Sequence, residues 1–297
     1  MQRFLLYINE RFSPVQLVPL AVLFGCAIGT LGPTLAGVPI ESYRIVAIIS
    51  ALFLFLFRLR VLDDIKDHGH DSVHHRDRPG ARGIIGQREL AWTAGATIVL
   101  EAVIAYLFGL VPFIAFLVMS VYAGVLFIEA LARDRIRDFF TPYIVLHELL
   151  LVPLLVYLCL LAAVPIVALA TFPLLALLAF LGALFFAIEV ARKLRAPQEE
   201  GTGKDTYTAQ YGVRGATLLL CSTVFVAYGA MAIIASQTTQ KSVIAYLLGF
   251  LVFFALCYNA FYFASVPVPR NARVLFVTTV GSVAFFLALL PGMLWLL

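Results

Sequence analysis

The segment from Arg58 to Arg88 has the sequence RLRVLDDIKDHGHDSVHHRDRPGARGIIGQR, and it separates two long apolar stretches. Asp63, Asp67 and Asp71 are spaced four residues apart within it. On a helix this spacing places the three carboxylates on one face. Carboxylates so arranged repel one another, and a chain tolerates them when a cation neutralises them.

Arginines follow these aspartates directly, at Arg76, Arg78 and Arg82. Carboxylates beside basic side chains suit an anionic ligand that reaches the carboxylates through a divalent cation. Diphosphate bridged by Mg²⁺ fits this description, because Mg²⁺ commonly sits between a few carboxylates and phosphate oxygens. The segment therefore predicts a magnesium-dependent diphosphate site.

The composition identifies a polytopic membrane protein, since 62% of the 297 residues are hydrophobic and only 13% are charged. Apolar runs long enough to cross a hydrocarbon layer of about 30 Å recur along the whole length. We predict nine spans, at about 15–36, 43–62, 88–108, 110–132, 139–163, 165–192, 213–236, 242–264 and 272–297. No cleavable signal is expected, because charged and polar residues interrupt the first apolar stretch.

The basic residues predict the orientation of these spans. All of the 21 lysines and arginines except Arg44 and Lys241 fall on the side that carries the N-terminus and the even-numbered loops. By the positive-inside rule, the N-terminus and those loops are cytoplasmic and the C-terminus is outside, in a membrane of the bacterial inner (plasma) type. The net charge of +4 thus reflects topology and contacts with anionic lipid or substrate, and no nucleic-acid partner is expected.

A second long polar loop has the sequence EVARKLRAPQEEGTGKDTYTAQYG, from Glu189 to Gly212. It also begins with charge at the predicted cytoplasmic end of an apolar helix, where Glu189 and Lys193 lie four residues apart. Because other connections are short, function is expected in the two loops at about 63–88 and 189–212. Their parallel indicates either an internal duplication or two half-sites that face each other.

The first loop resembles the acidic motif of the UbiA superfamily of intramembrane prenyltransferases, NDxxDxxxD at the cytoplasmic end of the second helix. The positions of that motif are filled here by Asp63, Asp64, Asp67 and Asp71, with Asp63 in place of the usual asparagine. The Arg-Pro and Gly that follow it in the family correspond to Arg78, Pro79 and Gly83.

The second loop resembles that family's second motif less closely. Glu189 takes the first acidic place, and GKDTYTAQYG (203–212) resembles the threonine-rich segment before helix 7. Lys193 replaces the second aspartate, and a family tyrosine–lysine pair is matched only by Glu129 and Arg133. These departures remove carboxylates from one half of the site and leave basic groups there.

The resemblance covers nearly the whole chain and implies an all-α fold. The expected architecture is a bundle of nine transmembrane helices, forming one domain over 1–297 with a central cavity open to the cytoplasmic side. The implied activity is Mg²⁺-dependent ionisation of an isoprenyl diphosphate, with transfer of the prenyl group to an aromatic or lipid acceptor. A terpene cyclase that quenches the same cation without an acceptor is an alternative, and a divalent-gated transporter is a third.

The resemblance also implies roles for individual residues. Magnesium ligation is assigned to Asp63, Asp67, Asp71 and Glu189. Asp64 is a further ligand or a partner of the ligands, and Lys193 belongs to the catalytic set. Diphosphate oxygens are assigned to Arg60, Arg78, Arg133 and Lys193. The histidines of the first loop make zinc a weaker alternative.

Two ionisable residues inside the fifth predicted span, His147 and Glu148, are candidates to accept a proton from the acceptor or the carbocation. An ionisable group inside a span is costly and commonly serves function, so Glu101 in the third predicted span is a functional candidate on the same ground. A buried polar pair that ties helices together is the competing interpretation.

Overall fold

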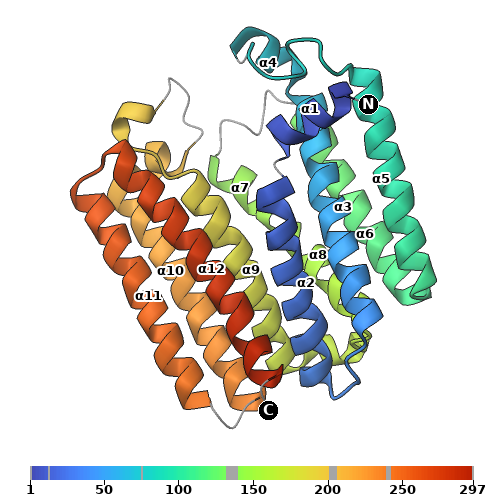
Figure 1. Ribbon diagram of the computed structural model, residues 1–297, viewed down its shortest axis with the longest axis vertical. Helices are drawn as coiled ribbons and strands as arrows, with labels where there is room; N and C mark the ends of the chain where they lie inside the picture. The colour runs from blue at the N-terminus through green and yellow to red at the C-terminus, as the bar shows by residue number, and fades with distance from the viewer. Residues whose placement is uncertain are drawn as a thin grey trace. The chain divides into compact units, whose positions relative to one another are not determined.

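A computed structural model describes residues 2–12, 14–74, 76–131, 140–200, 206–238 and 242–295, and these residues form helices without any strand (Figure 1). The elements are α1 (Gln2–Arg11), α2 (Pro14–Ala36), α3 (Ser42–Lys66), α4 (His68–His74), α5 (Gln87–Leu107), α6 (Leu110–Leu131), α7 (Phe140–Glu148), α8 (Leu151–Leu161), the 3₁₀ helix η1 (Ile166–Ala170), α9 (Phe172–Arg192), the 3₁₀ helix η2 (Pro197–Glu199), α10 (Tyr207–Thr238), α11 (Ser242–Ser265) and α12 (Pro269–Trp295).

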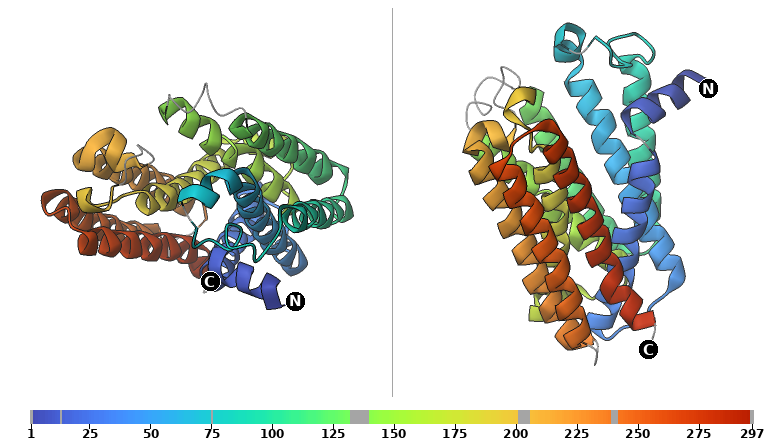
Figure 2. Two further views of the ribbon diagram at one scale, coloured as in Figure 1. Left: turned by 90° about the horizontal axis from the view of Figure 1, so that it is seen from above. Right: turned by 60° about the vertical axis from the view of Figure 1, so that its left-hand side comes forward.

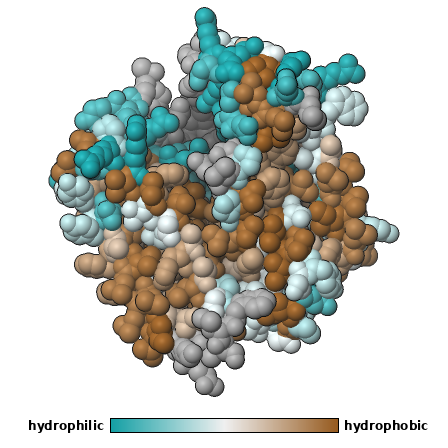
Figure 3. Space-filling model, in the orientation of Figure 1, coloured by the Kyte–Doolittle hydropathy of each residue, from teal (hydrophilic) through white to brown (hydrophobic). Residues whose placement is uncertain are grey.

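The predicted all-α membrane architecture is confirmed. Within the described ranges, nine helical segments are long and apolar enough to cross a membrane, and they match the nine predicted spans to within several residues. The space-filling view shows hydrophobic residues over the sides of these helices, whereas hydrophilic residues gather over α4 and its neighbouring loop (Figure 3). The chain is therefore an integral membrane protein.

The contacts within the chain divide it into two compact units, each of which is described by itself. The first unit comprises Met1–Gly29 and Glu41–Ala163, and the second comprises Thr30–Ile40 and Val164–Leu297. Helix α2 passes from the first unit to the second after Gly29.

In the first unit, α3 packs against α5, α6 and α8 (Figures 1 and 2). Helix α2 approaches α3 through Gly25 and Gly29, a pair with the small-xxx-small spacing that lets membrane helices come close. A Cβ atom added at Gly25 would lie 2.4 Å from Cγ1 of Ile49, and one at Gly29 would lie 2.6 Å from Cγ1 of Ile45. These glycines therefore leave room for the isoleucines of α3.

The fifth predicted span consists of two helices, α7 and α8, because Pro153 interrupts it. Proline has no N–H to donate to the carbonyl of Leu149, and its ring clashes with that carbonyl in a regular helix. The amide of Val152 bonds to Leu149 O instead, at 3.1 Å. Near the break, the hydroxyl of Tyr122 in α6 donates to the carbonyl of Leu146 at 2.8 Å. The backbone group at the end of α7 is thus satisfied by a side chain, as hydrocarbon surroundings require.

Arg44 ties the beginning of α3 to the end of α8. Its Nη1 donates to Leu161 O, a last-turn carbonyl of α8, at 3.1 Å. Its Nε bonds to Glu41, which also accepts from the hydroxyl of Tyr43 at 2.8 Å. These hydrogen bonds hold the pKa of Glu41 below its ordinary value, and the bond from Arg44 has the larger effect.

In the second unit, α10 packs between α9 and α11, and α12 lies against α9 and α11 (Figure 2). Gly212 kinks the beginning of α10, where its φ of 69° lies in the left-handed region. The regular part of α10 therefore begins at the predicted start of the seventh span.

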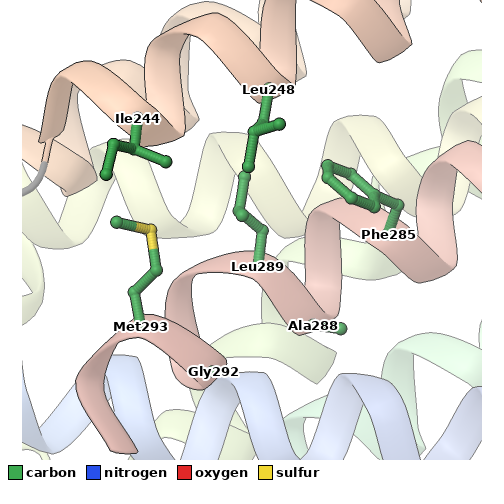
Figure 4. Close-up of a pocket in the computed structure, with 7 residues that line it drawn as sticks. All are labelled: Ile244, Leu248, Phe285, Ala288, Leu289, Gly292 and Met293. Atoms are coloured by element: carbon green, nitrogen blue, oxygen red, sulfur yellow. The ribbon is translucent and has the colours of Figure 1, made fainter. Parts of the chain in front are cut away.

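An open apolar groove of about 500 Å³ lies between α11 and α12 (Figure 4). Ile244 and Leu248 of α11 face Leu289 and Met293 of α12 across it. No charged side chain lines this groove. It suits a hydrocarbon chain and cannot serve a diphosphate, so the polar chemistry must be sought elsewhere.

The approach of α2 to α3 yields a first prediction. Gly25→Ala forces a methyl group against Ile49, and overpacking of this kind costs about 1–3 kcal/mol. The variant should unfold at a lower temperature than the wild type in detergent. Gly95→Ala in α5 is the matched control, because nothing lies within 4 Å of its added Cβ. Equal loss of stability in both variants would contradict the close packing of α2 on α3.

Candidate functional site

The first acidic segment begins at the last turn of α3. Helix α3 ends at Lys66, Asp67 is its C-cap, and Asp71 lies in the short helix α4. The four-residue backbone pattern nevertheless continues, since Asp67 N donates to Asp63 O and Asp71 N donates to Asp67 O, each at 2.8 Å. The three aspartates thus lie on consecutive turns although the helix changes direction between them.

Asp63 and Asp64 have different surroundings. Asp63 is exposed and accepts from Lys66 Nζ at 3.2 Å. Asp64 is buried, and its carboxylate accepts from the hydroxyl of Tyr7 at 2.9 Å and from the guanidinium of Arg11. Consecutive residues on a helix point about 100° apart, so the two aspartates form hydrogen bonds with different partners. Asp64 therefore ties α1 to the end of α3.

Tyr7 stays a hydrogen-bond donor in this arrangement. It is almost fully buried in an apolar cluster that includes Phe12, Phe57 and Val61. Burial, and then the adjacent Asp64 carboxylate, raise the pKa of Tyr7 far above its ordinary value. The hydroxyl therefore keeps its proton at any physiological pH.

The loop after α4 is folded by its own backbone and by α1. Gly83, with a φ of 71°, turns the chain so that Ile84 N donates to Pro79 O at 2.9 Å. Arg3 donates to Ile84 O at 2.8 Å, and Arg82 pairs with Glu10 at 3.1 Å. The glycine predicted by the resemblance is thus needed for a left-handed backbone position.

Asp71 and Arg78 are brought together by this loop. Their closest charged atoms, Oδ1 and Nη1, lie 2.6 Å apart. The side chain of Asp71 is 7% exposed, whereas that of Arg78 is 30% exposed. The arginine therefore neutralises a nearly buried carboxylate while part of its guanidinium remains accessible to a second anion.

The second acidic segment begins at the last turn of α9, in the second unit. Glu189 accepts from Arg192 at 2.8 Å and pairs with Lys193 Nζ at 2.9 Å. Lys193 is the C-cap of α9, and its side chain is 29% exposed. The predicted pair of Glu189 and Lys193 on one face is therefore formed, and two cations neutralise a single carboxylate.

Further along this segment, Glu200 has a structural role. It accepts from the hydroxyls of Thr206, at 2.7 Å, and Thr208. Thr206 in turn caps α10, since its Oγ1 accepts from Ala209 N at 3.0 Å. Glu200 thus holds the start of α10 and is engaged there rather than beside Glu189.

The remaining predicted residues are placed as follows. Arg60 is half-buried in α3, and its Nε donates to the carbonyl of Arg11 at 3.1 Å. His147 and Glu148 are half-buried at the end of α7, next to the break before α8. Arg133 lies outside the described residues.

The chemistry of the donors suits Mg²⁺, because carboxylate oxygens are the ligands that this hard cation prefers. Among the described residues, no three Asp, Glu, His or Cys side chains converge on one point. This still fits Mg²⁺, which is usually held by one or two carboxylates while phosphate oxygens and water complete its shell. A bound anion would therefore have to supply part of the coordination.

Sequence reasoning missed Tyr7 and Arg11, and treated Arg11 only as a topological charge. The available signal was their four-residue spacing, which places both on one face of a short helix. Their partner, Asp64, lies more than fifty positions away along the chain. Nothing local in the sequence identifies such a partner.

No protein-family model and no curated protein matches this chain. Solved structures do. A UbiA homolog from Aeropyrum pernix K1 superposes with a TM-score of 0.63 at 13% identity, covering 93% of this chain and 98% of that one. A digeranylgeranylglyceryl phosphate synthase gives 0.57 at 12% identity, covering 98% and 99%. The chain has the UbiA fold.

A third UbiA structure, the homolog from Archaeoglobus fulgidus bound to DMAPP and Mg²⁺, gives a TM-score of 0.56 at 10% identity. It covers 93% of this chain and 99% of that one. The likeness therefore extends over almost the full length of each protein. This agrees with the resemblance of the two motif loops, which was drawn from the sequence alone.

The contacts of Asp64 yield a second prediction. Tyr7→Phe removes one donor from a buried carboxylate, which should cost about 1–3 kcal/mol of stability. Thermal unfolding of the purified protein measures this. Tyr43→Phe is the matched control, since that hydroxyl bonds to Glu41 at an exposed position and should contribute well under 1 kcal/mol. If both variants unfold like the wild type, Tyr7 does not hold α1 on α3.

Proposed function

We propose that this chain is a Mg²⁺-dependent intramembrane prenyltransferase, which ionises an isoprenyl diphosphate and transfers the prenyl group to an aromatic or lipid acceptor. Two lines of evidence support it: the UbiA fold along the whole chain, and a UbiA neighbour that binds DMAPP with Mg²⁺. The observation that carries the proposal is the pair of Asp71 and Arg78. It joins a carboxylate for the metal to a cation for the phosphate in one folded loop.

In this proposal, Asp63, Asp67 and Asp71 ligate the metal from the first segment, and Glu189 does so from the second. When bound, Mg²⁺ would neutralise charge on the departing diphosphate as a Lewis acid. Asp64 acts indirectly, because Tyr7 and Arg11 occupy its carboxylate. It holds the end of α3 against α1.

Basic residues are proposed to hold the phosphate oxygens. Arg78 offers guanidinium donors beyond the one that bonds to Asp71. Lys193 provides a mobile ammonium group in place of the family's second aspartate, with Arg60 and Arg133 as further donors. Such pre-placed cations stabilise the charge that develops as the carbon–oxygen bond breaks.

Proton removal is assigned to His147 or Glu148. Both lie at the break between α7 and α8, where the regular helical hydrogen bonding of the backbone is interrupted. Loss of a proton is needed when the prenyl group joins a hydroxyl-bearing or aromatic acceptor. The proposal further treats 1–297 as one catalytic domain, with its polar loops and N-terminus in the cytoplasm of a bacterial-type plasma membrane.

The proposal predicts metal-dependent release of diphosphate. Purified protein should release it from C10 to C20 prenyl diphosphates in Mg²⁺ and not with chelator present. Asp67→Ala should lower the rate by at least about 100-fold, because a charge-stabilising contact to the leaving group is lost. Asp77→Asn is the matched control: Asp77 is an exposed aspartate of the same segment that lies outside the motif, so its rate should stay unchanged.

Products separate the transferase from the cyclase. Turnover that requires a phenolic or lipid acceptor supports transfer, whereas a cyclic product formed without an acceptor supports cyclisation by the same cation chemistry. If no prenyl diphosphate is bound or consumed with any acceptor, the proposed function is wrong.

A further inference from the structure

A buried ion pair lies inside the first unit, between α3 and α5. Nη2 of Arg58, in α3, is 3.1 Å from Oε2 of Glu101, in α5. The two side chains are 2% and 0% exposed. Glu101 is fourteen residues from the start of α5, which places it about 21 Å along the helix axis, well within a hydrocarbon layer.

The surroundings of this pair come from four helices, because Tyr157 of α8 also lies close enough to interact with both charges. Nη1 of Arg58 donates to Ser120 Oγ of α6 at 3.1 Å. The rings of Phe55 and Phe116 cover the guanidinium, with their centroids 5.4 Å and 6.0 Å from it. Nε of Arg58 and both carboxylate oxygens of Glu101 have no hydrogen bond within the described structure.

Such a pair contributes little net stability. Removing two charges from water costs several kcal/mol per ion, and only complete hydrogen bonding recovers it. Here the hydrogen bonding is incomplete. In contrast, a misplaced partner would leave a charge alone in hydrocarbon, which is strongly unfavourable. The pair therefore favours one helix arrangement over others more than it stabilises the fold as a whole.

The rest of the contact between α3 and α5 is mainly apolar, and Phe57 and Val61 of α3 share a buried cluster with Leu90 and Ala94 of α5. The buried face of α5 consists of Leu90, Ala94, Thr97, Glu101 and Ala105. Most of these side chains are small or apolar, and lipid tails are as apolar as they are, so the hydrophobic effect does not favour one register and only van der Waals packing distinguishes them. Sliding α5 by one turn would move the charges apart by about 5.4 Å.

We propose that Arg58 and Glu101 are positioning residues that fix the register of α3 against α5. Arg58 lies five residues before Asp63, on the helix that carries the first acidic segment, and the loop of Arg78 ends where α5 begins. The register of these helices therefore sets where the aspartates lie relative to that loop. The link from the register to the aspartates rests on the proposed function, whereas the role of the ion pair in fixing the register does not depend on it.

The test is a double-mutant cycle with a direct measure of register, in protein reconstituted in lipid nanodiscs. The variants are Arg58→Met, Glu101→Met and the double substitution. Nitroxide labels on ketone-bearing residues introduced at Val46 and Trp92, which are 63% and 71% exposed, report the distance between the two helices. This labelling leaves the native cysteines untouched.

Each single variant should lower the midpoint of thermal unfolding by roughly 10 °C, because it leaves an unpaired buried charge. The double variant should recover most of that loss. Its distance distribution should nevertheless broaden or gain a component shifted by about 5 Å. Diphosphate release in Mg²⁺ should fall at least about tenfold in the double variant, since small misplacements slow catalysis strongly.

Thr97→Val is the matched control on the same face of α5, because its hydroxyl bonds only to carbonyls of its own helix. It should match the wild type in stability, distance and rate.

A double variant with the narrow wild-type distance overturns the proposed register role. A shifted distance with an unchanged rate overturns the link to the aspartates. If the wild type itself releases no diphosphate, the proposed function fails, while the distance still decides the register.

Discussion

Hydrocarbon offers no hydrogen-bond partner, so a polar group inside the bilayer is costly unless the protein itself pairs or neutralises it. The first unit meets this constraint in different ways. Tyr122 supplies a donor where Pro153 breaks the fifth span, and Arg44 caps the end of α8. Arg58 and Glu101 neutralise each other in the middle of the helices. Each solution joins two helices, and the packing follows from where these polar groups find partners.

At the ends of the helices the same need for neutralisation takes another form. Three carboxylates of the acidic segments pair with cations from their own segments: Asp63 with Lys66, Asp71 with Arg78, and Glu189 with Lys193. Under the proposed function, ligand binding would give these carboxylates and basic side chains new partners, and no side chain would have to gain or lose a charge. A carboxylate would pass from a basic side chain to the metal, and that side chain would turn to a phosphate oxygen. Asp71 and Arg78 are the pair best suited to such an exchange, because a partly exposed cation lies beside a nearly buried carboxylate.

The sequence predicted those features that depend on a single segment. Nine spans follow from hydropathy, because a helix that satisfies its own backbone can be recognised without its neighbours. The pair of Glu189 with Lys193 follows from their four-residue spacing on one helix, whereas the pair of Asp71 with Arg78 was not predicted, because it depends on how the loop after α4 folds. The break in the fifth span was signalled by Pro153 and was overlooked. Arg58 was counted as a loop charge, since nothing near it in sequence reveals Glu101 as its partner.

The adjacent aspartates show how far a motif can guide the assignment of roles. A motif match treats Asp63 and Asp64 as neighbours in one acidic run, but a helix turns by about 100° between them. Asp64 consequently meets α1, where Tyr7 and Arg11 occupy its oxygens, and it becomes a structural anchor. Asp63 stays exposed and keeps only Lys66. One residue step thus separates a carboxylate that anchors α1 to α3 from one that would ligate the metal under the proposed function, and only the tertiary structure distinguishes them.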